Sequence, residues 1–246
     1  MAKKRYSHKE ILRSMKRDEL RDGLTGLQKY VREHSENILI AAIIIGVVAI
    51  LVPMYFRHRA TNEMRAASLL ARANSLLERP LTDEQTALTG QGFVSREAKY
   101  QKVRETFAEV HQTYSNTRAA DLAKLGEANA LYYLGRYEEA LAIYREAVEA
   151  FSADVVTASV RERLGATLEN LERWQEALET YQSLLASHPD YFHAPSVRLG
   201  IARCHEALGE IEVAREILER ELEADGFEGW TEAARRQLAL LEKRHP

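Results

Sequence analysis

The sequence predicts an all-α fold: an apolar N-terminal helix, an α-solenoid of about three to four helical hairpins, and a C-terminal capping helix. Ala, Leu, Glu and Arg dominate most of the chain and form helices readily. Only 12 glycines and 5 prolines interrupt the 246 residues, so long helices are expected. A charge-free run lies near the N-terminus, and the remainder repeats with a period of 37 residues.

These observations divide the chain into consecutive segments. Residues 1–37 form a basic N-terminal segment, and residues 38–56 form the apolar helix. Residues 57–117 form a first helical hairpin with an inserted loop at 80–94, and three repeats occupy residues 118–229. Residues 230–246 form the capping helix, where Ala233, Ala234, Leu238 and Leu241 share one face.

The run 38–56 has the length and composition of a transmembrane helix. Its nineteen residues contain no charge, and as a helix they extend roughly 28 Å, close to the ~30 Å hydrocarbon core of a bilayer. Tyr55 and Phe56 end the run where interfacial aromatic residues occur, and Arg57 follows them. A cleaved signal peptide is the alternative, but the run is long, 37 residues precede it, and no small-x-small cleavage site follows.

The charge distribution bears on orientation and partners. Residues 1–37 hold ten Lys/Arg against six Asp/Glu, a net charge of +4, although the whole chain carries −3. This excess favours a cytoplasmic N-terminus, but the counts close to the span are nearly even. The N-terminal segment has apolar residues at helical spacing, namely Leu20, Leu24, Leu27 and Val31. It forms either an amphipathic helix on anionic lipid or a partly ordered tail. The acidic remainder argues against nucleic acid as a partner.

The repeats provide the strongest signal in the sequence. The segments that begin at Leu134, Leu171 and Leu208 align at a spacing of 37 residues, each with an alanine six residues further on. Gly135, Glu172 and Gly209 are expected at the turn inside each hairpin, and Tyr137, Trp174 and Ile211 at the start of the second helix. Small residues at 128, 165 and 202 let the two helices approach, and bulky residues at 144, 181 and 218 fill the space to the next hairpin.

This pattern resembles the tetratricopeptide repeat. Gly165, Ala177 and Tyr181 carry the small–small–aromatic signature of that family, and Pro189 closes the middle repeat. The first repeat has Ser152 and the third Gly226 near the closing position. An earlier hairpin is expected to pair residues 62–79 with a helix containing Tyr100, Val103, Phe107 and Val110.

Candidates for catalysis or metal binding are few. His188 and His193 flank Asp190 in a loop, but no second ligand pair supports a metal site there. The single cysteine, Cys204, fits a packed helix position better than a nucleophile and allows no internal disulfide. No phosphate-binding or nucleophile-elbow motif occurs. We expect no enzyme, no cofactor, no metal and no small-molecule substrate.

The resemblance to tetratricopeptide repeats implies a groove lined by the first helix of each hairpin. The implied groove is mixed and mildly acidic, and an ordinary solvated side chain is the alternative role at each position. Leu125 and Glu162 stand where family members that clamp a terminal carboxylate need cations. The residues expected to line the groove are Asn129, Tyr132, Glu162, Glu169, Arg203 and Glu206.

The order of parts from about Leu27 to Leu241 resembles a bacterial envelope family of ancillary SecYEG translocon subunits and cell-division coordinators. Residues 31–37 and the Ala-rich stretch 66–77 are the local cues. The resemblance implies a single-pass protein of the inner membrane, with a cytoplasmic N-terminus and periplasmic repeats. Implied partners are translocon subunits, periplasmic chaperones or exported proteins. A cytoplasm-facing membrane scaffold and a structural subunit of an envelope secretion or assembly complex are the alternatives.

Overall fold

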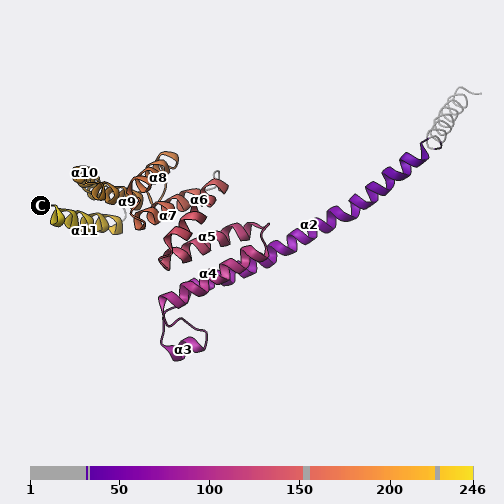
Figure 1. The fold of residues 1–246 in the computed structure, drawn as a ribbon, viewed down its shortest axis with the longest axis horizontal. Helices are drawn as coiled ribbons and strands as arrows, with labels where there is room; N and C mark the ends of the chain where they lie inside the picture. The colour runs from indigo at the N-terminus through magenta and orange to yellow at the C-terminus, as the bar shows by residue number, and fades with distance from the viewer. Residues whose placement is uncertain (1–31, 33, 152–155, 225–227, 246) are drawn as a thin grey trace, which may run out of the picture. The chain divides into compact units, whose positions relative to one another are not determined.

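The described part of the structure is almost entirely helical, which confirms the all-α prediction. A computed structural model describes residues 32, 34–151, 156–224 and 228–245, and Figure 1 shows their helices. The chain divides into two units, residues 1–60 and 61–246. The helices are α2 (Ser35–Glu78), α3 (Glu84–Leu88), α4 (Arg96–Thr113), α5 (Arg118–Tyr133), α6 (Tyr137–Ala150), α7 (Val156–Asn170), α8 (Trp174–Ser187), α9 (Ala194–Ala207), α10 (Ile211–Glu223) and α11 (Glu228–Arg244).

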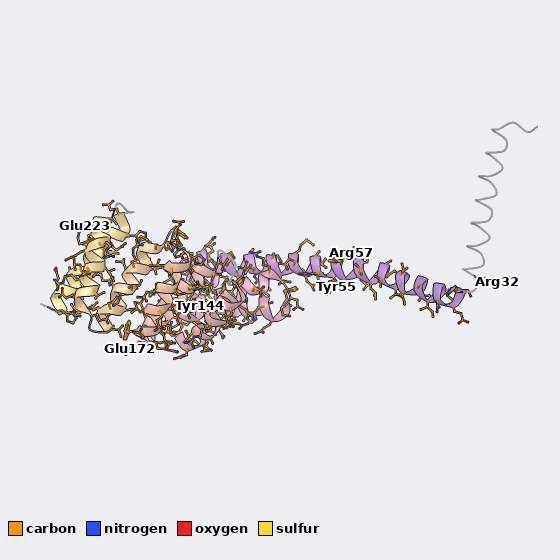
Figure 2. The ribbon with its side chains drawn as sticks, turned by 90° about the horizontal axis from the view of Figure 1, so that it is seen from above. Arg32, Tyr55, Arg57, Tyr144, Glu172 and Glu223 are labelled. Atoms are coloured by element: carbon orange, nitrogen blue, oxygen red, sulfur yellow. The ribbon has the colours of Figure 1, made fainter. Side chains whose placement is uncertain are left out.

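The first unit contains the apolar half of α2. This helix continues through Pro53, and its most apolar 18-residue window has a mean hydropathy of 2.8 with no part buried. Tyr55 and Arg57 project from neighbouring positions of the helix (Figure 2). The predicted apolar N-terminal helix is therefore present. Leu20, Leu24, Leu27 and most of the N-terminal segment lie outside the described residues.

Each of the three repeats is a helical hairpin, and the hairpins keep the 37-residue period. Their second helices, α6, α8 and α10, begin at Tyr137, Trp174 and Ile211, as the sequence predicted. The preceding turn has a left-handed residue in every repeat, with φ of 74° at Gly135, 57° at Glu172 and 84° at Gly209. Glycine adopts this conformation without a Cβ clash, so Glu172 is the strained member of the three.

Bulky side chains at the predicted register form the core between hairpins. Tyr144, Tyr181 and Leu218 are each at most 2 % exposed, and Phe107 of α4 occupies the same position one period earlier. The ring of Tyr181 packs so closely on α7 that a Cβ added to Gly165 would lie 2.4 Å from it. This position therefore requires glycine for the two helices to approach.

The second unit begins with a hairpin made of the end of α2 and of α4. Ala66 and Ala73 of α2 share a buried cluster with Val103 and Phe107 of α4. The Glu63 carboxylate accepts the backbone N–H groups of residues 118 and 119 at 3.3 Å each. N–H groups in the first turn of a helix have no acceptor within that helix, so these contacts with Glu63 tie α2 to the first repeat.

The insertion predicted at 80–94 contains a helix that the sequence pattern did not predict. Asp83 caps the short helix α3, because its side chain accepts the backbone N–H of Thr86 at 2.9 Å. Leu81 and Phe93 pair through a β-bridge at the base of the loop. The Arg79 guanidinium donates to the Gly90 carbonyl at 2.7 Å. The insertion is thus held by its own hydrogen bonds.

The last helix, α11, covers the end of the third repeat. Ala234 and Leu241 are fully buried in a cluster with Leu218, and the Gln237 amide donates to the Leu199 carbonyl of α9 at 3.2 Å. The helix begins at Glu228, two residues before the predicted start. Its apolar side chains therefore pack on the repeat in the manner expected of a capping helix.

Candidate protein-binding site

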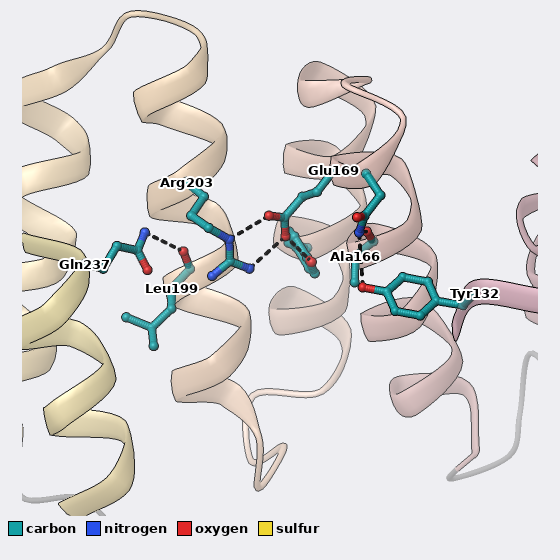
Figure 3. A network of polar contacts seen from close by, with 8 residues as sticks. Tyr132, Ala166, Glu169, Leu199, Arg203 and Gln237 are labelled. Atoms are coloured by element: carbon teal, nitrogen blue, oxygen red, sulfur yellow. Dashed lines mark hydrogen bonds and ion pairs between the residues drawn. The ribbon is translucent and has the colours of Figure 1, made fainter. Parts of the chain in front are cut away.

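A row of polar contacts joins the first helix of each hairpin to that of the next hairpin and, at the end, to the capping helix α11. Tyr132, Glu169 and Glu206 stand 37 residues apart, at the same position of α5, α7 and α9. The Tyr132 hydroxyl accepts from the Asn170 amide at 3.1 Å, and Glu169 accepts from the Arg203 guanidinium at 2.6 and 2.9 Å. Figure 3 shows these contacts. We call the row the polar ladder, and its third member is the Arg244–Glu206 pair, at 2.8 Å.

The middle of the polar ladder reaches into the core. The hydroxyl of Tyr181, which is 2 % exposed, donates to the Glu169 carboxylate at 2.5 Å. Burial raises the pKa of Tyr181, and the charge of Glu169 raises it further. The Glu169 side chain is 10 % exposed, so Tyr181 and Arg203 satisfy a carboxylate that has little access to water. This contact fixes the spacing of α7 and α9.

The residues predicted to line the groove all form hydrogen bonds or ion pairs with other residues of the chain. Asn129 accepts from the Tyr144 hydroxyl at 2.7 Å. Glu162 accepts from the Tyr191 hydroxyl at 2.7 Å and lies 3.2 Å from Nδ1 of His193. Tyr132, Glu169, Arg203 and Glu206 belong to the polar ladder. The carboxylates that suggested an acidic groove therefore have partners in neighbouring hairpins, which periodicity alone could not identify.

A cluster of tyrosines lies beside the polar ladder. Tyr100 of α4 stacks on Tyr133 of α5 with ring centroids 4.5 Å apart, and Tyr132 meets Tyr133 edge-on at 5.6 Å. The Arg163 guanidinium of α7 lies 5.9 Å from the centre of the Tyr133 ring. Tyr133 remains 42 % exposed. Exposed tyrosine beside arginine is a composition enriched at binding hot spots. Of this cluster, sequence analysis placed only Tyr132 in the groove.

The candidate metal and nucleophile residues have structural partners. His188 contacts Ser187 at 2.9 Å, whereas His193 contacts Glu162, so the two histidines face different neighbours. Within the ranges that the structure describes, no group of three His, Cys, Asp or Glu side chains is arranged to hold a metal ion. Cys204 is fully buried, and burial raises the pKa of its thiol to about 12. A thiol in this state is a poor nucleophile at neutral pH.

Two tetratricopeptide-repeat models match the chain, at residues 125–192 and 170–243. Among solved structures, the repeats of a protein described as a kinesin light chain from Podosopora anserina superpose with a TM-score of 0.53 at 16% identity, covering 73% of this chain and 85% of that one. BtubC (BKLC) from P. vanneervenii gives a TM-score of 0.53 at 15% identity, with 75% and 83% covered. These likenesses show the fold alone. No curated protein matches the chain. Matched models, period and helical hairpins together establish a tetratricopeptide-repeat protein with a long apolar N-terminal helix.

Proposed function

We propose that this protein is a single-pass membrane adaptor whose tetratricopeptide repeats bind other proteins. The observation that carries the proposal is the continuity of α2. An uncharged window of mean hydropathy 2.8 and the packed Ala66 and Ala73 of the first hairpin belong to one uninterrupted helix. A run that is apolar on all sides and has no buried part within the chain gains most from lipid. Stacked repeats are usually scaffolds for protein contacts rather than enzymes.

We further propose that the repeats face the periplasm of a bacterial cell and act on exported proteins beside the translocon. The excess of Lys/Arg in residues 1–37 supports a cytoplasmic N-terminus. The order of parts supports kinship with ancillary translocon subunits. Partners in this proposal are translocon subunits, periplasmic chaperones or exported chains, bound without any cofactor.

The proposed contact surface is the tyrosine cluster together with the flanking polar ladder. Tyr133 offers exposed aromatic area, and the Arg163 guanidinium lies 5.9 Å from the centre of its ring. Asn129 and Glu162 lie on α5 and α7, the helices that carry Tyr133 and Arg163. Because the polar ladder fixes the hairpins relative to one another, it presents this surface to a partner with little further ordering.

The topology is tested with two reporters fused after residue 246, one active only outside the cytoplasm and one fluorescent only inside it. The proposal expects activity outside. Fusions placed after residue 34, before the apolar run, serve as the matched control and should report the cytoplasm. Fluorescence from the C-terminal fusion would overturn the periplasmic proposal and favour a membrane scaffold for soluble cytoplasmic partners.

The binding surface is tested by co-purification in mild detergent from cells that express the full chain. Tyr133→Ala and Arg163→Glu should each reduce recovery of translocon subunits or periplasmic chaperones, whereas Ser159→Ala, on an exposed face of α7, should not. Stoichiometric recovery of one large envelope complex, unaffected by these substitutions, would instead indicate a structural subunit.

A further inference from the structure

The middle repeat leaves one arginine without the carboxylate that its counterparts have. Lys124, Arg161 and Arg198 occupy the same position of α5, α7 and α9, each 37 residues apart. Lys124 pairs with Glu146 at 2.7 Å, and Arg198 pairs with Glu221 through two nitrogens. Arg161 instead donates to the Ser187 hydroxyl at 2.7 Å. In the part of the chain that the structure describes, it pairs with no carboxylate.

The repeat register explains this difference. The position that Glu146 holds in the first repeat is held by Ser183 in the second. The position that Glu221 holds in the third repeat is held by Leu184 in the second, where the side chain is fully buried. In the first and third repeats one of these two positions supplies the carboxylate. In the second repeat neither position is acidic. The second repeat thus has the cation, Arg161, but not the glutamate that pairs with it in the other repeats.

Arg161 lies on a cleft between α6, α7 and α8. The cleft has a volume of about 390 Å³, and its apolar lining comes from Val148, Leu164 and Leu168. A cleft beside Lys124 shares with it the register positions of Arg161, Thr180 and Ser183, and has a volume of about 40 Å³. There Ile143 stands in register with Thr180, and Glu146 with Ser183. At these two positions the middle repeat has the smaller side chains, which leaves more space beside Arg161 than beside Lys124.

Two carboxylates line the cleft, those of Glu176 and Glu179, and both have other partners than Arg161. Glu176 is held by Arg145 at 2.8 Å and by two hydrogen bonds from Arg173 at 2.6 and 2.8 Å. Glu179 accepts from the neutral Gln175 amide at 3.0 Å and keeps its charge, but among the described residues it forms no ion pair with Arg161. Two turns further along α8, Ser183 and Ser187 are the polar groups on the side of Arg161. This end of the cleft therefore combines an apolar wall with a guanidinium that, within the described residues, has no directly paired carboxylate.

We propose that the cleft between α6, α7 and α8 binds an acidic side chain of a partner protein, whose carboxylate pairs with Arg161 while an adjacent aliphatic side chain packs on Val148, Leu164 and Leu168. The inference rests on the proposed role in protein binding but not on the side of the membrane. A planar guanidinium forms paired hydrogen bonds to a carboxylate, and Arg198 shows this arrangement with Glu221 in the next repeat. The volume suits a few side chains rather than a whole helix.

The test uses the full chain in lipid nanodiscs and two capped peptides, acetyl-Leu-Glu-Leu-amide and its Gln counterpart. Binding is followed by NMR of the methyl groups of Val148, Leu164 and Leu168. We expect the Glu peptide to bind about 1.5-fold to fivefold more tightly than the Gln peptide, the range for a partly exposed ion pair. Arg161→Gln should abolish this difference. Capping both ends excludes a terminal carboxylate as the ligand.

A matched pair of variants at position 183 distinguishes the effect of a larger side chain in the cleft from the effect of its charge. Ser183→Glu introduces the carboxylate that the first repeat uses and should abolish the preference for the Glu peptide, whereas Ser183→Gln, of nearly the same size, should leave most of it. Equal binding of the two peptides to the wild-type chain, or a preference that survives Arg161→Gln, would overturn the inference. A cytoplasmic C-terminus in the topology test would leave it standing, so failure of each proposal is recognised separately.

Discussion

The second and third repeats have an arginine at the same position, Arg161 and Arg198, but the two side chains make different contacts. Arg198 is paired with Glu221, whose side chain is 6 % exposed, and this contact joins α9 to α10. Arg161 bonds a serine and lies on an open cleft. Positions that repeat along the chain specify the hairpin and its stacking. Positions that break the repeat, such as Ser183 and Leu184, distinguish one hairpin from another, and there we place recognition.

The largest effect expected from this comparison follows Arg198→Gln. The substitution leaves Glu221 buried without its cation, which should cost about 2–4 kcal/mol of stability. Arg161→Gln at the equivalent position should change stability by less than about 0.5 kcal/mol. Both are measured by urea unfolding of the full chain in mild detergent, followed by the fluorescence of Trp174 and Trp230.

A control variant checks the cause of that loss. Arg198→Leu combined with Glu221→Leu removes both charges and introduces the leucine found in register at 184. It should regain most of the stability lost in Arg198→Gln. If the two single arginine substitutions destabilise the protein equally, the distinction between the repeats is wrong.

The next effect concerns the close packing of the middle repeat. Gly165→Ala places a Cβ 2.4 Å from the Tyr181 ring, and overpacking of this kind should cost about 1–3 kcal/mol. The same unfolding measurement applies, with Ser159→Ala on the exposed face of α7 as the control, for which a change below about 0.5 kcal/mol is expected. An unchanged midpoint for Gly165→Ala would mean that Tyr181 has more room than the structure gives it.

A smaller effect with the opposite sign is expected at the turn of the middle repeat. Glu172 has a φ of 57°, where the other repeats have Gly135 and Gly209. Glu172→Gly should therefore stabilise the protein by about 0.5–1 kcal/mol, since glycine avoids the clash of the left-handed conformation. The reciprocal variant, Gly209→Glu, should destabilise it by a similar amount. A loss of stability in Glu172→Gly would show that the Glu172 side chain makes a compensating contact.

The repeat period predicted the fold well because hairpin packing depends on side-chain size at fixed spacing. The turns at Gly135, Glu172 and Gly209 and the core positions of Tyr144 and Tyr181 follow directly from it. The helix α3 was not predicted, since its formation depends on one capping side chain, Asp83, within a loop-like sequence.

The candidate binding site was harder to predict from the sequence than the fold. The resemblance to tetratricopeptide repeats placed Glu169 and Arg203 in the groove, but it did not reveal their contact, which joins residues 34 apart in successive hairpins. Whether a charged residue is paired or free depends on such contacts. The stack of Tyr100 on Tyr133 likewise joins two helices that the repeat pattern treats separately. One available signal was the absence of Glu at positions 183 and 184, which only alignment of the chain with itself reveals.

The most direct test of this central difference is a double-mutant cycle between Arg161→Gln and Ser183→Glu. If Arg161 lacks a carboxylate, Ser183→Glu should supply one, as Glu146 does for Lys124 at 2.7 Å. Unfolding free energies of the two single variants and the double variant should then give a stabilising coupling of about 0.5–1 kcal/mol, reduced by salt. A coupling near zero would contradict the account, because it would mean that Arg161 is not available to a carboxylate in the cleft.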